Sequence, residues 1–129
     1  DELAKRLIPV AWGPATTSRS KLELIDRTLE TPRLLAAAGV RFAIMTDHPV
    51  IPNWLLRLTA ALAVSEGLDE QVALRALTIV PAEICGVADQ VGSLETGKRA
   101  DIVLWDGHPL ETRAHVSRAW IDGQLVYRR

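Results

Sequence analysis

The sequence predicts an α/β fold with one βαβ unit, helices that cover its sheet, and a small antiparallel β element at the end. Two short apolar runs, residues 7–13 and 40–46, flank a helical segment. Such a strand, helix and strand form a right-handed crossover with both strands parallel in one sheet. Further along, capping residues delimit several helices, and Asp122-Gly123 between two apolar triplets is a strong signal for a two-residue hairpin.

Turn residues delimit the βαβ unit. The first run ends at Gly13, as a buried strand would, although Pro9 inside it is unfavourable for a strand. Thr31 is expected to cap the crossover helix, with Pro32 at its first position and Gly39 as its terminator. This helix leads the chain directly into the second strand.

Three more helices are expected before residue 87. Asn53 can cap the first of them, residues 54–66, Asp69 can cap the second, and Pro81 opens a shorter third. The first should bury a stripe at spacings of three and four, formed by Leu55, Leu58, Leu62 and Ser65. Short strands separated by glycines follow, so we expect two parts, residues 1–86 and residues 87–129.

Composition and charge exclude several classes of partner. The 129 residues are 48% hydrophobic and carry a net charge of −1, which argues against nucleic acid and against an anionic membrane as ligands. No apolar run approaches the ~20 residues that cross a bilayer, and no signal peptide opens the chain, so a cytoplasmic location is expected. Cys85 is the single cysteine and fits no metal pattern, so we expect a buried, inert thiol.

Asp47 is the leading candidate for catalysis. It follows the second apolar run and precedes His48 and Pro49, where α/β folds place their chemistry, outside the carboxyl ends of parallel strands. The competing interpretation is a helix N-cap or a turn-forming carboxylate ahead of Pro49. From the residues alone we weight the two interpretations about equally.

Other polar residues carry weaker signals. His48 is a candidate for substrate binding, because an imidazole beside a catalytic carboxylate can take part in the reaction or can simply orient the loop. Arg19, in the polar loop after the first strand, could hold a substrate carboxylate in a bidentate pair, although a solvated surface arginine is the simpler interpretation. Three further groups are expected to be structural or solvent-exposed, namely His108, His115 and the pair Lys98-Arg99.

Two segments, residues 44–49 and residues 78–105, resemble the C-terminal part of the amidohydrolase superfamily, the metal-dependent hydrolases that include imidazolonepropionase. The resemblance implies the last two βα units of a (β/α)₈ (TIM-type) barrel, with residues 7–13 as strand seven and residues 41–46 as strand eight. Short strands of a small β-sandwich would follow from about residue 91. The barrel is incomplete in this chain, since a (β/α)₈ barrel typically needs ~250 residues.

The same resemblance implies a metal-dependent hydrolase of non-peptide C–N bonds, of the cyclic amide or amidine type, acting on a small molecule. Asp47 would contact a divalent metal, zinc or iron, and handle the proton of the attacking water. The histidine ligands of the family lie on earlier strands, and His48, His108 and His115 match none of those positions. Catalytic zinc usually has three protein ligands, so we expect this chain alone to bind no metal and to be inactive.

An alternative of a different class follows from the two barrel-type strands. They would leave open sheet edges, which favour pairing with another chain, so the polypeptide could be a non-catalytic folding and association unit that forms a homo-oligomer. Residues 1–6 are typical of the end of a helix whose start is missing, which suggests a truncated or processed polypeptide.

Overall fold

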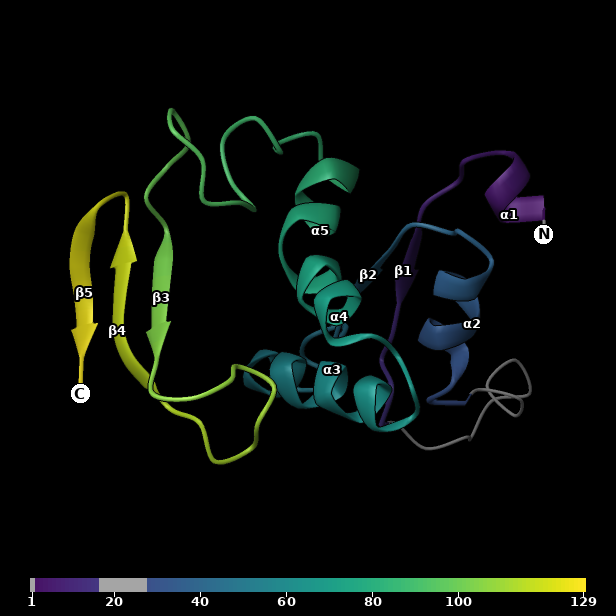
Figure 1. The fold of residues 1–129 in the computed structure, drawn as a ribbon, viewed down its shortest axis with the longest axis horizontal. Helices are drawn as coiled ribbons and strands as arrows, with labels where there is room; N and C mark the ends of the chain where they lie inside the picture. Colours follow the sequence, from purple (N-terminus) through teal and green to yellow (C-terminus); the bar gives the residue numbers. More distant parts are fainter. Residues whose placement is uncertain (1, 17–27) are drawn as a thin grey trace.

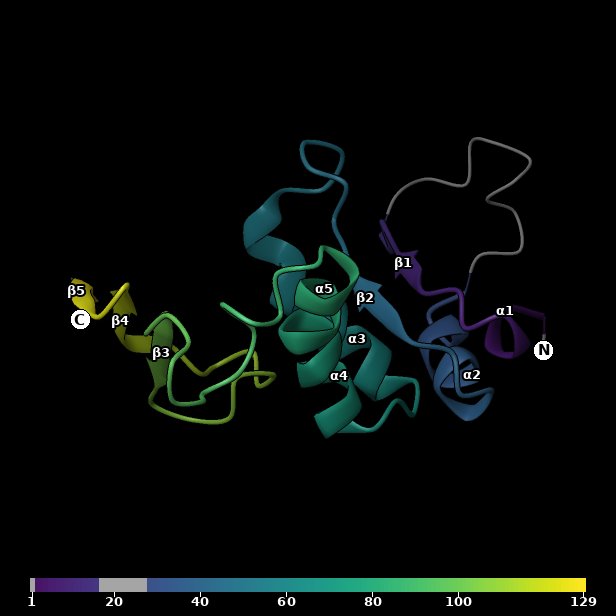
Figure 2. The same ribbon diagram turned by 90° about the horizontal axis from the view of Figure 1, so that it is seen from above.

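The computed structural model describes residues 2–16 and 28–129, and it shows an α/β protein with two separate sheets. Helices α3 to α5 lie between the two sheets in both views (Figures 1 and 2). In chain order the elements are α1 (Glu2–Lys5), β1 (Val10–Trp12), α2 (Thr31–Ala37), β2 (Phe42–Ile44), the 3₁₀ helix η2 (Asn53–Leu55), α3 (Leu56–Ser65), α4 (Glu70–Leu77), α5 (Ile79–Ile84), β3 (Ile102–Trp105), β4 (Val116–Ile121) and β5 (Gln124–Arg128).

The predicted βαβ unit is confirmed. Strands β1 and β2 pair in parallel, with Val10 opposite Phe42 and Trp12 opposite Ile44, and α2 forms part of the crossover between them. Both strands are shorter than predicted. Leu7 precedes β1 with a φ of 54°, and a residue with positive φ cannot continue an extended strand.

The core lies where helices α2 to α5 contact β2. Trp12, Phe42 and Ile44 supply its large side chains, and small residues of α3 and α4 pack against them. The stripe predicted for α3 is wrong: its buried residues are Thr59, Ala60 and Ala63, whereas Leu58 is 39% exposed. Periodicity alone favoured the leucines, but the two alanines, each 0% exposed, allow the helix to pack more closely.

The helix ends confirm some predicted caps and correct others. Asp69 is the N-cap of α4, and its carboxylate accepts hydrogen bonds from the backbone N–H groups of Gln71 and Val72 at 2.9 and 3.0 Å. Thr31 is the first helical residue of α2 rather than its cap, and Asn53 lies inside η2 rather than capping α3. Helix α5 begins at Ile79, two residues before the predicted Pro81.

The C-terminal sheet is antiparallel, in the order β3-β4-β5. Asp122 and Gly123 have φ values of 51° and 75°, which confirms the predicted hairpin between β4 and β5. Residues 87–101 contain turns and no strand. The first strand of this sheet therefore begins at Ile102, later than the expected start near residue 91. Within the part of the chain that the structure describes, no helix is long and apolar enough to span a bilayer.

Candidate functional site

Asp47 lies just past the carboxyl end of β2, on the same side of the two-stranded sheet as the carboxyl end of β1. The parallel register brings the two ends together, and the backbone N–H of Met45 donates to the carbonyl oxygen of Trp12 at 2.9 Å. Gly13 follows Trp12, and a Cβ there would lie 2.0 Å from the carbonyl oxygen of Met45. Only glycine therefore fits at position 13, where β1 ends beside the end of β2.

The Asp47 side chain is exposed to solvent. Its backbone begins a turn in which its carbonyl oxygen accepts the N–H of Val50 at 2.8 Å, and Thr46 accepts the N–H of Ile51 at 3.3 Å. The φ of Asp47 is 53°, a conformation that aspartate tolerates better than most residues. The helix N-cap interpretation is wrong, because the next helical segment begins only at Asn53. The turn therefore uses the main chain of Asp47 and presents its carboxylate outward.

The other predicted site residues have different outcomes. His48 is exposed beside Asp47 in the same turn. Arg19 lies outside the described residues. Among residues 2–16 and 28–129, no group of three or more histidine, cysteine, aspartate or glutamate side chains could hold a metal ion. Asp47 is thus a single donor in this region, and the residues described do not form a metal site by themselves.

Several expectations for the second half of the chain need correction. Cys85 is exposed rather than buried. The side chain of Lys98 is only 12% exposed, and its ammonium donates to the hydroxyl of Ser93 and to Glu95. The Ser93 hydroxyl and then Lys98 hold the pKa of Glu95 below its ordinary value of 4.5. Lys98 therefore organises a turn instead of extending into solvent.

The histidines of the C-terminal part contact neighbouring residues, and the Nε2 of His108 also lies 3.8 Å from a carboxylate oxygen of Glu70 in α4. The Nδ1 of His108 accepts the backbone N–H of Leu110 at 3.4 Å. The backbone N–H of His115 donates to the carboxylate of Asp106 at 2.7 Å, and this bond is the main cause that lowers the pKa of Asp106. Both histidines thus take part in the connection between β3 and β4.

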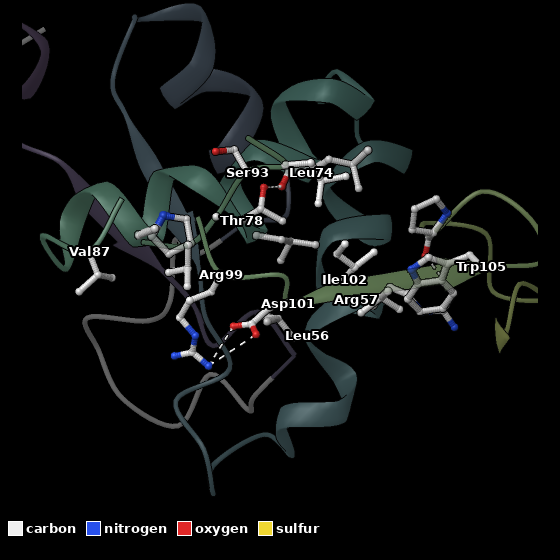
Figure 3. Close-up of a pocket in the computed structure, with 18 of the residues that line it drawn as sticks. Leu56, Arg57, Leu74, Thr78, Val87, Ser93, Arg99, Asp101, Ile102 and Trp105 are labelled. Atoms are coloured by element: carbon white, nitrogen blue, oxygen red, sulfur yellow. Dashed lines mark hydrogen bonds and ion pairs between the residues drawn. The ribbon is translucent and has the colours of Figure 1, made fainter. Parts of the chain in front are cut away.

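A groove that the sequence did not predict lies between the helices and β3 (Figure 3). Its volume is about 860 Å³, and its helical wall includes Leu74, Leu77 and Ala82. Ile102 and Val103 of β3 line the other wall. Asp47 and His48 do not line it, so the groove is separate from the predicted site.

Arg57 lines the groove and joins α3 to the C-terminal part. Its guanidinium donates to the carbonyl oxygens of Pro109 and Glu111 at 2.9 and 2.7 Å and lies 4.9 Å from the ring centroid of Trp105. Charge-assisted hydrogen bonds and a cation–π contact are among the stronger polar interactions available to a side chain. No local sequence pattern indicates this contact, because its partners lie about fifty residues away along the chain.

The chain thus has a parallel strand pair with an exposed carboxylate just past its carboxyl end, and open α/β sheets in general bind their ligands outside that edge. The family comparison is more specific. The sequence model of the amidohydrolase family matches residues 3–126 of this chain. The chain belongs to the amidohydrolase family.

Individual relatives agree with this assignment. The chain is similar to a crystal structure of an amidohydrolase from Thermotoga maritima, with 48% identity and a TM-score of 0.95 over 99% of the chain. It is 32% identical over 107 residues, 79% of its length, to the imidazolonepropionase of Maricaulis maris. A zinc-bound adenosine deaminase structure from Xanthomonas campestris is 30% identical over 91% of the chain, with a TM-score of 0.61.

The chain covers a small share of each of these proteins. It spans 33% of the Thermotoga maritima chain, 27% of the imidazolonepropionase and 31% of the deaminase. Among other curated relatives the share is 5% to 34%. What the whole proteins do therefore comes to this chain only as a proposal.

Proposed function

We propose that this chain is the C-terminal part of a metal-dependent amidohydrolase that hydrolyses non-peptide C–N bonds in a small cyclic amide or amidine. The observation that carries the proposal is the exposed carboxylate of Asp47 at the carboxyl end of β2, in a chain whose residues 3–126 match the amidohydrolase family. In this proposal β1 and β2 are the last two strands of a TIM-type barrel. The sheet β3-β4-β5 is part of a β-sandwich.

Asp47 is the proposed catalytic residue. An aspartate at a strand end can accept the proton of the attacking water and pass it to the departing nitrogen, and positioned general acid–base groups typically contribute about 10²–10⁴-fold to a rate. The exposure of Asp47 supports this role, because an exposed carboxylate can reach a water molecule or a substrate. The adjacent His48 and, in the loop after β1, Arg19 are the proposed substrate contacts.

The residues described here do not fit a complete metal site. Asp47 is one carboxylate, whereas a catalytic zinc usually has three protein ligands. The further donors must come from polypeptide outside these residues, and we propose that the isolated chain has no hydrolytic activity. The zinc-bound deaminase among the similar structures supports a divalent metal as cofactor, zinc or iron.

A chimera tests this function. Residues 1–129 would replace the matching third of the Thermotoga maritima amidohydrolase, which the 48% identity and the TM-score of 0.95 make feasible. We expect the metal-loaded chimera to hydrolyse C–N bonds in a panel of cyclic amides and amidines, detected as a ring-opened product or as released ammonia, and the isolated chain to hydrolyse none. A folded chimera that binds metal but hydrolyses no C–N bond would contradict the proposal, provided that the unaltered Thermotoga enzyme is active on the same panel.

The second candidate function, a self-associating fragment, is favoured by the two-stranded sheet. Among the described residues β1 pairs with β2 alone, so the outer edge of each strand carries unpaired backbone groups, and such edges favour pairing with another chain. Light scattering of the isolated chain and its zinc content separate the candidates. A tight homo-oligomer without metal would favour the association unit, whereas a metal bound at Asp47 with ligands from a neighbouring copy would favour a working site.

A further inference from the structure

The segment between Asp47 and Arg57 links the candidate catalytic carboxylate to helix α3 with little slack. The carbonyl oxygen of Asp47 accepts the N–H of Val50 at 2.8 Å. Further along, the carbonyl oxygen of Pro52 accepts the N–H of Leu55 at 2.9 Å. The 3₁₀ helix η2 then runs directly into α3, whose second residue is Arg57. A shift of the first turn of α3 is therefore passed back along this segment to Asp47.

Burial does not fix this segment. Every residue from 47 to 58 is exposed or only partly buried, and a segment with few buried contacts opens easily. Its position therefore depends on its two ends, β2 and α3. Among residues 2–16 and 28–129, Arg57 alone joins residues 47–58 by a hydrogen bond to a part of the chain that is far away in sequence.

Arg57 is anchored to a part of the chain that the core holds in place. Its Nη1 atom donates to the carbonyl oxygens of Pro109 and Glu111. Its guanidinium also lies over the ring of Trp105 (Figure 3). Leu110, between the two acceptors, is 7% exposed and belongs to the buried cluster. The anchor of Arg57 is therefore tied to the core.

We propose that Arg57 is a positioning residue for Asp47, an inference that rests on the catalytic role proposed for Asp47. By tying the first turn of α3 to the connection between β3 and β4, Arg57 fixes the turn that presents the Asp47 carboxylate. A displacement of about 1 Å in a reacting group can lower a rate by about 10²-fold. The C-terminal part, which supplies no catalytic side chain in the proposed function, thus acts on the reaction through Arg57.

A double-mutant cycle in the metal-loaded chimera tests this role. Arg57→Met removes the hydrogen-bond donors and keeps most of the side-chain length. We expect it to lower kcat about tenfold and to leave KM within about twofold, because it disturbs the reacting geometry and not substrate binding. In an Asp47→Asn background the same substitution should lower kcat by less than about twofold, because the group that Arg57 positions is already lost.

Two further variants complete the cycle. Arg57→Lys keeps a charged donor and should bring kcat back to within about threefold of the unaltered chimera. Arg41→Met is the matched control, because it removes an arginine whose ion pair with Glu83 also joins distant segments, and it should leave kcat within about twofold. Equal losses of kcat from Arg57→Met in the two backgrounds would show that Arg57 only stabilises the fold. That result, or an unchanged kcat in Arg57→Met, would overturn the proposal.

Amide hydrogen exchange of the 129-residue chain, measured by NMR, follows the turn without any catalysis. The N–H groups of Val50 and Ile51 close the turn. Arg57→Met should speed their exchange about fivefold or more, and Arg41→Met should leave it within about twofold. Equal exchange in the two variants would overturn the positioning role. If Asp47→Asn alone kept the kcat of the unaltered chimera, the proposed function would be contradicted, whereas faster exchange at Val50 and Ile51 would still show that Arg57 holds the turn.

Discussion

Gly13 fixes the close approach of β1 and β2 at the edge where Asp47 lies. It has a φ of 149°, and a Cβ there would lie 2.0 Å from the carbonyl oxygen of Met45 and 2.9 Å from its carbonyl carbon. Gly13→Ala would therefore cause backbone strain of about 1–3 kcal/mol and overpacking of similar size. We expect the free energy of unfolding to fall by about 2–6 kcal/mol, a large share of the stability of a small domain.

Gly39→Ala is the matched control for this prediction. Gly39 has a φ of 71°, but a Cβ there would meet no atom within 4 Å. Its substitution should cost about 1–2 kcal/mol, from the backbone alone. Urea unfolding followed by tryptophan fluorescence suits both variants, because Trp12 is only 6% exposed and reports on the sheet. If Gly13→Ala lost no more stability than Gly39→Ala, the close contact with Met45 would be refuted as the reason for glycine.

Two further predictions concern caps and charge. Asp69→Ala should lower the free energy of unfolding by about 1 kcal/mol, because it removes the N-cap of α4. Asp69→Asn should change that free energy by only about a few tenths of a kcal/mol, because asparagine also caps helices. Equal losses for the two variants in urea unfolding would show that the charge, and not the cap, is what stabilises the helix. The N–H of His115, followed by the charges of His115 and Arg129, holds the pKa of Asp106 below its ordinary value of 3.8. A lowered pKa in the folded state stabilises the fold above the unfolded-state value, and this contribution is lost as the pH falls through the folded-state value. Acid titration of the melting temperature should therefore show a shallower decline below about pH 4 in Asp106→Asn than in the unaltered chain, and an unchanged slope would argue against this linkage.

Features with local causes could be predicted from the sequence. Asp69 caps α4 through bonds to residues two and three positions away, and Asp122-Gly123 needs only two residues that accept positive φ. The parallel pairing of β1 and β2 followed from chain order and the handedness of crossovers. The position of Asp47 at the end of a buried strand was apparent for the same reason.

Features that depend on distant partners could not be predicted. The buried face of α3 is decided by what packs on it, and Ala60 and Ala63 join the buried cluster of Phe42 and Ile44 although the leucines have the stronger hydrophobic signal. Lys98 is largely buried because Ser93 and Glu95 fold back onto it. Cys85 is exposed because α5 ends beside the groove, which exists only once the helices and β3 are in place.

The central claim about function is that the carboxylate of Asp47 is catalytic. Substitution of Asp47 in the chimera with the Thermotoga maritima enzyme tests this claim most directly. We predict that Asp47→Asn lowers kcat/KM by about 10²-fold or more. The control Asp89→Asn makes the same chemical change at an exposed position away from both strand ends and should leave kcat/KM within about twofold. A folded Asp47→Asn chimera with the kcat/KM of the Asp89→Asn control would contradict the proposed role of Asp47.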